Sequence, residues 1–280
     1  MKIVENAILV VLACSVIVQG QEAPNFLDKS CSIIPIEEPR IIGGRNAKIN
    51  TTPWMTMILD ENGYRCGGSL ITNLFVLTAA HCTGDTKLKV RLGQYRLEWN
   101  CRGVNCLGSA QEFTVGAMYI HSEYSRGSHD IALLKLDTRV QYTNRIRPIC
   151  LLMDPLFRHL DDHIIKFRTY GWGQIESGEL GQVIQTTTLY NLPRTNCYRQ
   201  YRYNVIDGNH ICAERATAGT CKGDSGGPLT AIIKYAHRDT IFQFGIVSAG
   251  EKTCEKASIF TNVMAHLNWI ESIVRREENF

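Results

Sequence analysis

The feature that most constrains the fold is a series of short apolar runs separated by turn-forming residues. These runs recur between Thr52 and Gly250 and read TPWMTMIL, FVLTAA, KVRLGQYRL, IALLKL, PLTAIIKY and FQFGIVSAG. Glycine, asparagine and aspartate separate them, and apolar residues at helical spacing are rare. Many brief strands with frequent turns are typical of an all-β barrel or sandwich. The chain is therefore expected to be all-β, and its 280 residues suffice for a substantial core.

One amphipathic helix is predicted near the C-terminus. Its apolar stripe consists of Val263, Leu267, Ile270 and Val274, and Asn262 can cap its first turn. The opposite face is not a continuous basic surface, so the stripe is expected to dock on the barrel and not on a membrane.

The N-terminus has the pattern of a secretory signal peptide. A basic start at Lys2 is followed by an apolar run from Ala7 to Val18 that is too short to span a bilayer comfortably. We expect a signal peptide over residues 1–20, with cleavage after Gly20, and a short pro-segment over residues 21–40. A buried N-terminal helix and a membrane anchor that retains the leader are the alternatives.

The cysteine content fits a secreted chain. Removal of Cys14 with the leader leaves ten of the eleven cysteines. In an oxidising compartment ten cysteines indicate five disulfides, although about 945 pairings are possible. Cys101 and Cys106 form the only close pair, and no second pair stands at the spacing of a zinc finger. A net charge of +3 also argues against nucleic acid as a partner.

Three local patterns carry possible chemistry. They are Leu77–Cys82 (LTAAHC), Ser128–Leu134 (SHDIALL) and Cys221–Pro228 (CKGDSGGP). Each alone is ordinary: a structural histidine, an aspartate that ends a turn, and a glycine-rich bend.

Together the three patterns supply a nucleophile and its activators. A serine hydroxyl needs a base, and an imidazole oriented by a carboxylate is such a base. Ser225, His81 and Asp130 fit these roles. Gly223 lets its own N–H and that of Ser225 converge on a developing oxyanion.

These motifs together resemble the chymotrypsin-like (trypsin-like) family of serine endopeptidases. The resemblance extends from Ile41 to the C-terminal helix. It implies two six-stranded antiparallel β-barrels with a C-terminal α-helix, a protease domain over residues 41–280, and peptide hydrolysis by His81, Asp130 and Ser225 without a cofactor.

The sequence RIIGG from Arg40 to Gly44 resembles the family's activation junction. Cleavage after Arg40 would free the amino group of Ile41, which would pair with the carboxylate of Asp224. Breaking a buried ion pair is strongly destabilising, so this pair is expected to act as a switch.

Other residues match or depart from the family pattern. The turn Tyr170–Gly173 resembles the family's Gly-Trp-Gly turn, and Ser248 resembles the serine that supports the catalytic aspartate. Tyr64 stands where relatives often carry a histidine that restrains the zymogen.

The resemblance also implies disulfides. They are Cys31–Cys150, Cys66–Cys82, Cys101–Cys106, Cys197–Cys212 and Cys221–Cys254. The loop closed by Cys101 and Cys106 resembles one of insect clip-type proteases. No clip domain is expected, because residues 21–40 are too few and contain only Cys31.

The substrate pocket departs from that of tryptic relatives. The resemblance assigns the pocket to Gly219, Thr220, Ser248, Gly250 and Ser258. Tryptic members carry an aspartate six residues before the serine, where this chain has Gly219. Ser258 replaces a glycine and would narrow the pocket.

A groove residue differs as well, because Ala249 replaces the usual tryptophan. An uncharged pocket favours small or medium apolar side chains and argues against tryptic specificity. In the alternative, Glu251 or Glu255 turns into the pocket and restores a preference for basic residues.

Local sequence predicts one further site, and the family resemblance argues against another. Asn50-Thr51-Thr52 is a glycosylation sequon in a chain expected to be secreted. Gln94 and Gln111 stand where some relatives place acidic calcium ligands, so no metal site is expected.

The sequence thus predicts an extracellular serine endopeptidase made as a zymogen. Its expected partners are a protein or peptide substrate and an upstream activating protease, with a serine protease inhibitor as a further candidate. Neither nucleic acid nor a membrane is expected. The alternative is a non-catalytic or weakly active homologue that binds a partner or regulates a cascade.

Overall fold

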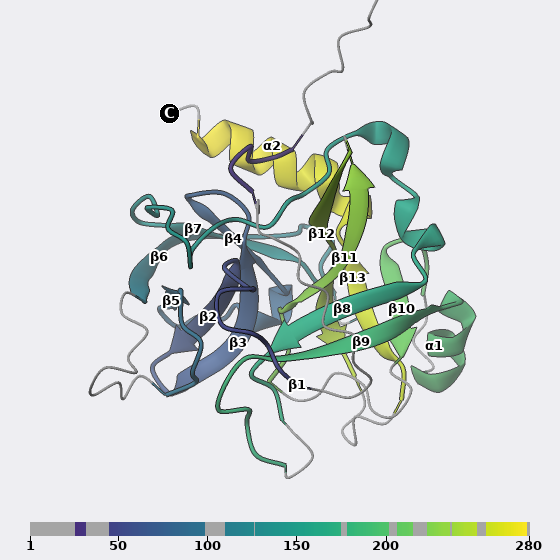
Figure 1. The fold of residues 1–280 in the computed structure, drawn as a ribbon, viewed down its shortest axis with the longest axis horizontal. Helices are drawn as coiled ribbons and strands as arrows, with labels where there is room; N and C mark the ends of the chain where they lie inside the picture. Colours follow the sequence, from purple (N-terminus) through teal and green to yellow (C-terminus); the bar gives the residue numbers. More distant parts are fainter. Residues whose placement is uncertain are drawn as a thin grey trace, which may run out of the picture.

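The computed structural model describes residues 26–31, 45–98, 110–125, 127–174, 178–201, 206–214, 223–235, 237–250 and 256–278. These residues form two antiparallel β-barrels side by side, with a C-terminal helix across one end (Figure 1). The predicted all-β class with two six-stranded barrels and a C-terminal helix is confirmed. Within the described ranges, no helix has the length and apolar character needed to span a membrane.

The first barrel is closed and contains the N-terminal strands. They are β2 (Met55–Asp60), β3 (Gly63–Leu70), β4 (Phe75–Thr78), β5 (Lys89–Leu92), β6 (Gln111–Ile120) and β7 (Ala132–Leu136). The order around the barrel is β2-β3-β4-β7-β6-β5. Strand β4 is buried along its whole length and β7 nearly so, because both are short apolar runs.

The second barrel contains the C-terminal strands. They are β8 (Lys166–Gly171), β9 (Gln185–Leu192), β10 (His210–Glu214), β11 (Pro228–Tyr235), β12 (Arg238–Ala249) and β13 (Ser258–Asn262). Pairing of β8 with β9 closes the ring, and β1 (Arg45–Asn46) adds to the outer side of β9. The barrel interior is rich in aromatic side chains, including Phe167 and Phe244.

Two contacts tie the barrels together. The Trp54 ring, just before β2, packs edge-on against Tyr170 of β8 with 5.8 Å between the ring centroids. The Ser69 hydroxyl donates to Gln243 Oε1 at 2.6 Å, between β3 and β12. Both of these polar side chains are buried, so this bond replaces the water that each loses on folding. The two barrels are thereby held in fixed relation.

The helices are few and mostly short. They are η1 (Ala80–Cys82), η2 (Pro155–Phe157), η3 (Leu160–His163), α1 (Arg194–Tyr201), η4 (Met264–His266) and α2 (Leu267–Glu278). The C-terminal prediction is confirmed in its buried stripe, but the first turn is the separate 3-10 helix η4. Asn262 Oδ1 accepts from the Met264 N–H at 3.0 Å, so the predicted cap belongs to η4. Helix α1 was not predicted from the sequence.

Part of the predicted pro-segment lies against the second barrel. Within residues 26–31, Phe26 packs against Phe242 of β12 with 5.6 Å between the ring centroids. Cys31 forms a disulfide with Cys150, as the resemblance implies. This segment is therefore packed on the second barrel and covalently joined to Cys150, which precedes β8 and forms a bridge with Phe242 of β12.

Candidate active site

The imidazole of His81 is held by Asp130 from two sides. His81 lies in η1, which begins two residues after the end of β4, and Asp130 lies two residues before the start of β7. The ring atom Nδ1 is 2.7 Å from Asp130 Oδ2, and the backbone N–H of His81 donates to Oδ1 at 2.9 Å. A carboxylate only accepts, so Nδ1 carries the hydrogen and Nε2 is left as a base. The two residues lie 49 positions apart in the chain and meet because β4 pairs with β7.

The carboxylate of Asp130 is buried and fully engaged. Ser248 Oγ donates to Oδ2 at 2.6 Å, which is the contact expected of this serine. Thr261 Oγ1 donates to the Asp130 carbonyl at 2.9 Å. Burial by itself raises the pKa of Asp130, but the hydrogen bonds from His81 and Ser248 and the electrostatic attraction of His81 outweigh it. The pKa of Asp130 therefore lies below its usual value, and the group is ionised at neutral pH.

The loop that carries Ser225 is packed between the two barrels. The Ser225 carbonyl accepts from the Gly67 N–H at 2.8 Å, and the Gly226 N–H donates to Val247 O at 2.9 Å. Gly226 has a φ of 78°, and a Cβ there would lie 2.2 Å from Thr78 Oγ1. Only glycine permits this approach, so the loop packs directly against the segment that leads into η1.

The residue before the serine is held by the Gly-Trp-Gly turn. Asp224 Oδ1 accepts from the backbone N–H of Gly173 at 2.9 Å. Trp172, in the middle of the turn, is completely buried and fixes the turn between the barrels. The carboxylate of Asp224 thus has a defined position beside the serine loop. The partner expected for it, the amino group of Ile41, lies outside the described residues together with Arg40.

Tyr64 supports the other end of the serine loop. Its hydroxyl donates to the carbonyl of Gly223 at 2.7 Å, and its ring packs edge-on against Trp172. Burial of the phenol, followed by the nearby charge of Asp224, raises the pKa of Tyr64 well above its usual value, so the hydroxyl keeps its hydrogen. The sequence showed only that a tyrosine stands here in place of the histidine that relatives often carry. The structure shows what the tyrosine does: it anchors the residue whose N–H was predicted to stabilise an oxyanion.

A disulfide and the side chain of Arg65 stabilise the segment after His81. Cys82 is joined to Cys66 by a disulfide, which confirms this implied pairing. Arg65 Nε donates to the Cys82 carbonyl at 2.7 Å, and Arg65 Nη2 donates to the Thr83 carbonyl at 2.7 Å. Sequence reasoning missed Arg65, because its acceptors are backbone carbonyls 17 and 18 residues away.

The described part of the predicted pocket lies at the ends of two paired strands. Ser248 and Gly250 are at the end of β12, and Ser258 begins β13 and is completely buried. Gly219 and Thr220 lie outside the described residues.

Some of the other predicted sites lie within the described residues and others lie outside them. The disulfide Cys197–Cys212 is confirmed. The pairings Cys101–Cys106 and Cys221–Cys254, and the signal peptide over residues 1–20, fall outside the described residues. Asn50 is exposed in a turn, with a φ of 68°.

Gln94, considered above in relation to calcium, has a structural role. Its amide Nε2 donates to the carbonyls of Arg96 and Leu97, at 2.7 and 3.3 Å. The side chain therefore organises the loop that follows β5.

Comparison with known proteins gives consistent matches. The family model described as Trypsin matches residues 41–270. Serine protease grass of Drosophila melanogaster is 32% identical over 252 residues, which cover 82% of this chain and 67% of the relative. Proclotting enzyme of Tachypleus tridentatus is 32% identical over 271 residues, which cover 89% of this chain and 70% of the relative.

A solved structure shows the same likeness in three dimensions. The crystal structure of the Drosophila Grass clip serine protease of the Toll pathway matches with a TM-score of 0.75 and 30% identity, over 88% of this chain and 75% of that one. The family match, the relatives and the two-barrel fold agree, and the chain belongs to the trypsin family of serine proteases.

Proposed function

We propose that the protein is a secreted serine endopeptidase, made as a zymogen and activated by cleavage after Arg40. The observation that carries the proposal is the buried hydrogen-bonded series from Ser248 through Asp130 to His81. A structural histidine needs only one partner, whereas this imidazole is fixed at Nδ1 and at its own backbone while Nε2 is left available as a base. The protease names of the relatives support the same class of activity.

The proposed chemistry is acyl transfer to a serine in two steps. The Ser225 hydroxyl attacks the carbonyl carbon of the scissile peptide bond while His81 Nε2 takes the hydroxyl proton. Asp130 stabilises the resulting imidazolium. The oxyanion of the tetrahedral intermediate is bound by the N–H groups of Gly223 and Ser225. His81 then protonates the leaving amine, and a water molecule activated by His81 hydrolyses the acyl-enzyme.

Activation is proposed to act through Asp224. Cleavage after Arg40 frees the Ile41 ammonium, which pairs with the Asp224 carboxylate beside Gly173. This carboxylate is only partly covered and already accepts a backbone hydrogen bond. The added charge pair fixes the serine loop, including the Gly223 N–H, in its productive arrangement. We infer an upstream protease that cuts after arginine as the activator.

Substrate preference is proposed to be non-tryptic. Gly219 supplies no carboxylate to pair with an arginine or lysine side chain, and the buried Ser258 hydroxyl takes the place of a glycine. Small or medium apolar residues before the scissile bond therefore fit best. A peptide library digested by the activated enzyme tests this: cleavage mainly after arginine or lysine would refute it.

A fluorophosphonate probe tests the enzyme proposal itself. After controlled cleavage at Arg40, the probe is expected to form a covalent adduct on Ser225. The variant Ser225→Ala should give no adduct, and Arg40→Ala, which cannot be cut there, should label at least about tenfold more slowly, as expected for a misassembled oxyanion hole. An unlabelled but folded, cleaved protein would instead indicate the non-catalytic homologue.

A further inference from the structure

Three histidines outside the proposed catalytic set gather beside Asp130. His121 directly follows β6, His129 directly precedes Asp130, and His266 ends η4. One donor nitrogen from each ring lies within 4.8 Å of the other two. His266 is buried, whereas His121 and His129 are half-buried. The cluster therefore reaches from the core to the solvent, so an ion could enter it.

The spacing of the rings suits a small cation after a modest adjustment. His129 Nδ1 and His266 Nε2 are 3.0 Å apart and share a hydrogen bond, whose hydrogen a bound ion would replace. Two nitrogens bound to one tetrahedral zinc ion are about 3.3 Å apart. The rings of His121 and His129 are stacked, with 4.6 Å between their centroids. They must splay to share an ion. His121 is held by a long hydrogen bond of 3.3 Å from the Glu123 N–H, which leaves its ring able to turn.

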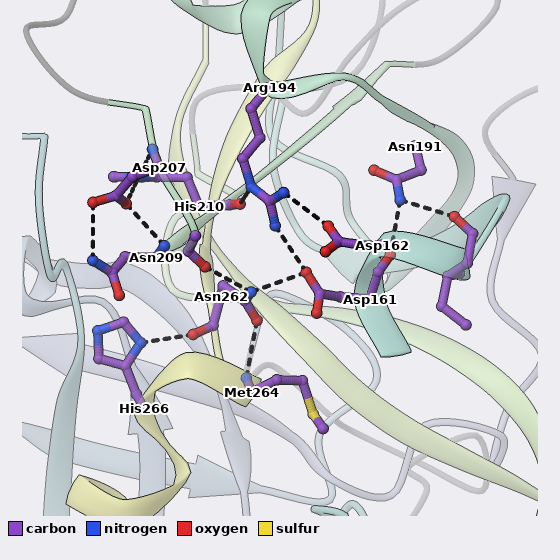
Figure 2. Close-up of polar contacts among 12 residues, drawn as sticks. Asp161, Asp162, Asn191, Arg194, Asp207, Asn209, His210, Asn262, Met264 and His266 are labelled. Carbon is purple, nitrogen blue, oxygen red and sulfur yellow. Dashed lines mark hydrogen bonds and ion pairs between the residues drawn. The ribbon is translucent and has the colours of Figure 1, made fainter. Parts of the chain in front are cut away.

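The orientation of His266 is fixed from behind. Its Nδ1 lies 2.6 Å from the carbonyl of Asn262, which only accepts, so Nδ1 carries the hydrogen and Nε2 presents its lone pair to His129. Figure 2 shows how the carbonyl is held in turn: Asn262 Nδ2 donates to Asp161 Oδ2, which also pairs with Arg194. A ring whose outer N–H is bound to a carbonyl is the arrangement typical of metal-binding histidines.

Burial favours the neutral form of two imidazoles in the cluster, and one acidic side chain lies beside the third. Burial lowers the pKa of His266 to about 4, and the neighbouring imidazoles add to this effect. Burial likewise lowers the pKa of His121. Neutral imidazole is the form that binds metals. On the other side, His129 Nε2 lies 3.7 Å from the Glu123 carboxylate, which can support a bound imidazole as an outer partner.

We propose that His121, His129 and His266 form a binding site for a divalent ion of the zinc class, and that its occupancy lowers peptidase activity. Imidazole ligands suit zinc, copper and nickel, and three protein ligands leave a position for water. The effect on activity rests on the proposed function. His129 is joined to Asp130 by one peptide bond and has a left-handed φ of 48°. A turn of His129 toward an ion would therefore displace the carboxylate that holds His81.

No local sequence motif predicts this site. His121 and His129 lie in the loop between β6 and β7, and His266 is 137 residues further along than His129. The expectation of no metal site came from cysteine spacing and from Gln94 and Gln111, and neither concerns these histidines.

Titration calorimetry with zinc chloride tests the binding. The mature protein is prepared without a histidine tag and is freed of metal with a chelator. One saturable site is expected. His121→Gln and His129→Gln should each weaken binding by more than about tenfold, and Glu123→Gln by roughly tenfold. The matched control is His163→Gln, which changes an exposed histidine of η3 and should bind as the wild type does. Thermal melting without zinc verifies that each variant is folded.

The activity of the cleaved enzyme is then measured with and without zinc. Inhibition is expected in the wild type and in His163→Gln, and should be lost in His121→Gln at the same zinc concentration. Equal inhibition in His121→Gln would place the ion elsewhere, for example on His81, and would overturn the proposal.

Two results separate this inference from the proposed function. Zinc binding in a protein that fails to react with the fluorophosphonate would support the site and refute the enzyme. Absence of saturable binding by the wild type, or unchanged affinity in both histidine variants, would refute the site whatever the activity.

Discussion

At the scale of single residues, the position of Asp224 depends on two glycines, because a side chain at either position would occupy the space of its carboxylate. A Cβ at Gly171 would lie 2.2 Å from Asp224 Oδ1, and a Cβ at Gly173 would lie 2.4 Å from it. The two glycines flanking Trp172 therefore make the space in which the carboxylate lies. The proposed activation switch needs this carboxylate in place. The Gly-Trp-Gly turn is therefore as necessary to the switch as Asp224 itself.

The Tyr64 hydroxyl gives a prediction at this scale. In Tyr64→Phe the Gly223 carbonyl loses a donor at 2.7 Å, and the peptide that follows it is less firmly oriented. We expect kcat to fall by roughly 3–10-fold, which corresponds to the net value of about one hydrogen bond. KM should stay nearly unchanged, because substrate contacts are retained. Steady-state kinetics of the cleaved enzyme measure both constants.

A second tyrosine provides the control for this experiment. The Tyr95 hydroxyl also donates to a backbone carbonyl, that of Ala47, at 2.7 Å. Tyr95→Phe should lower thermal stability to a similar degree without the fall in kcat. If the two variants have the same kcat, Tyr64 has only a structural role.

The candidate site could be predicted from sequence only where its motifs are local. Ser225 and Asp224 share one short pattern, and His81 and Asp130 each end or begin an apolar strand. Arg65 and the histidine cluster were not predicted, because their partners are brought together by strand pairing and not by sequence proximity. A sequence separation of more than one hundred residues, as between His129 and His266, produces no periodic pattern in the sequence.

At the scale of elements, the segments that sequence missed are those without an apolar stripe. In α1 the only buried residue is Cys197, and the helix is held instead by its disulfide and by polar contacts such as Tyr201 Oη to Ala257 O at 2.6 Å. Strand β6 alternates between half-buried and exposed residues, but Met118 and Ile120 lie on the exposed side. Apolar residues on both faces conceal the alternation that would reveal a strand.

The docking of α2 gives a prediction with a defined pH dependence. Hydrogen bonds from Lys135 of β7, and then from Arg276, lower the pKa of Glu277 from 4.5 to about 2. The stabilisation is therefore complete above about pH 4.5 and is lost as the pH falls toward 2. Glu277→Gln should lower Tm by about 1–2 °C at pH 7, as expected for an exposed ion pair in a domain of this size. Calorimetry at several pH values should show the difference vanish toward pH 2.

The neighbouring Glu271 is the matched control on the same helix. It pairs with Arg275 within α2 and so does not join the helix to the barrel. Glu271→Gln should change Tm less than Glu277→Gln does at pH 7. A larger effect of Glu271→Gln would mean that the contact with Lys135 contributes little to docking.

At the scale of the whole molecule, the segments that precede and follow the two barrels in the sequence pack against them. Helix α2 follows the last strand of the second barrel, yet its Glu277 reaches Lys135 of the first barrel at 3.0 Å. The segment containing Phe26 packs on the second barrel although it precedes the first strand of the fold. Recurrent short runs predicted the all-β class and the family resemblance implied the two barrels, whereas these contacts join segments that are distant in the sequence.

The disulfide Cys31–Cys150 predicts how the molecule behaves on activation. Because Cys31 precedes Arg40 and Cys150 follows it, cleavage after Arg40 should divide the backbone without separating the fragments. Denaturing electrophoresis should show one species without reductant and a light and a heavy fragment with it. In Cys150→Ser the light fragment should separate without reductant, since the packing of Phe26 does not survive denaturation. Release of the light fragment from the unreduced wild type would refute the linkage. If the linkage holds, the segment that covers Phe242 stays with the active enzyme, so that apolar surface is not exposed by activation.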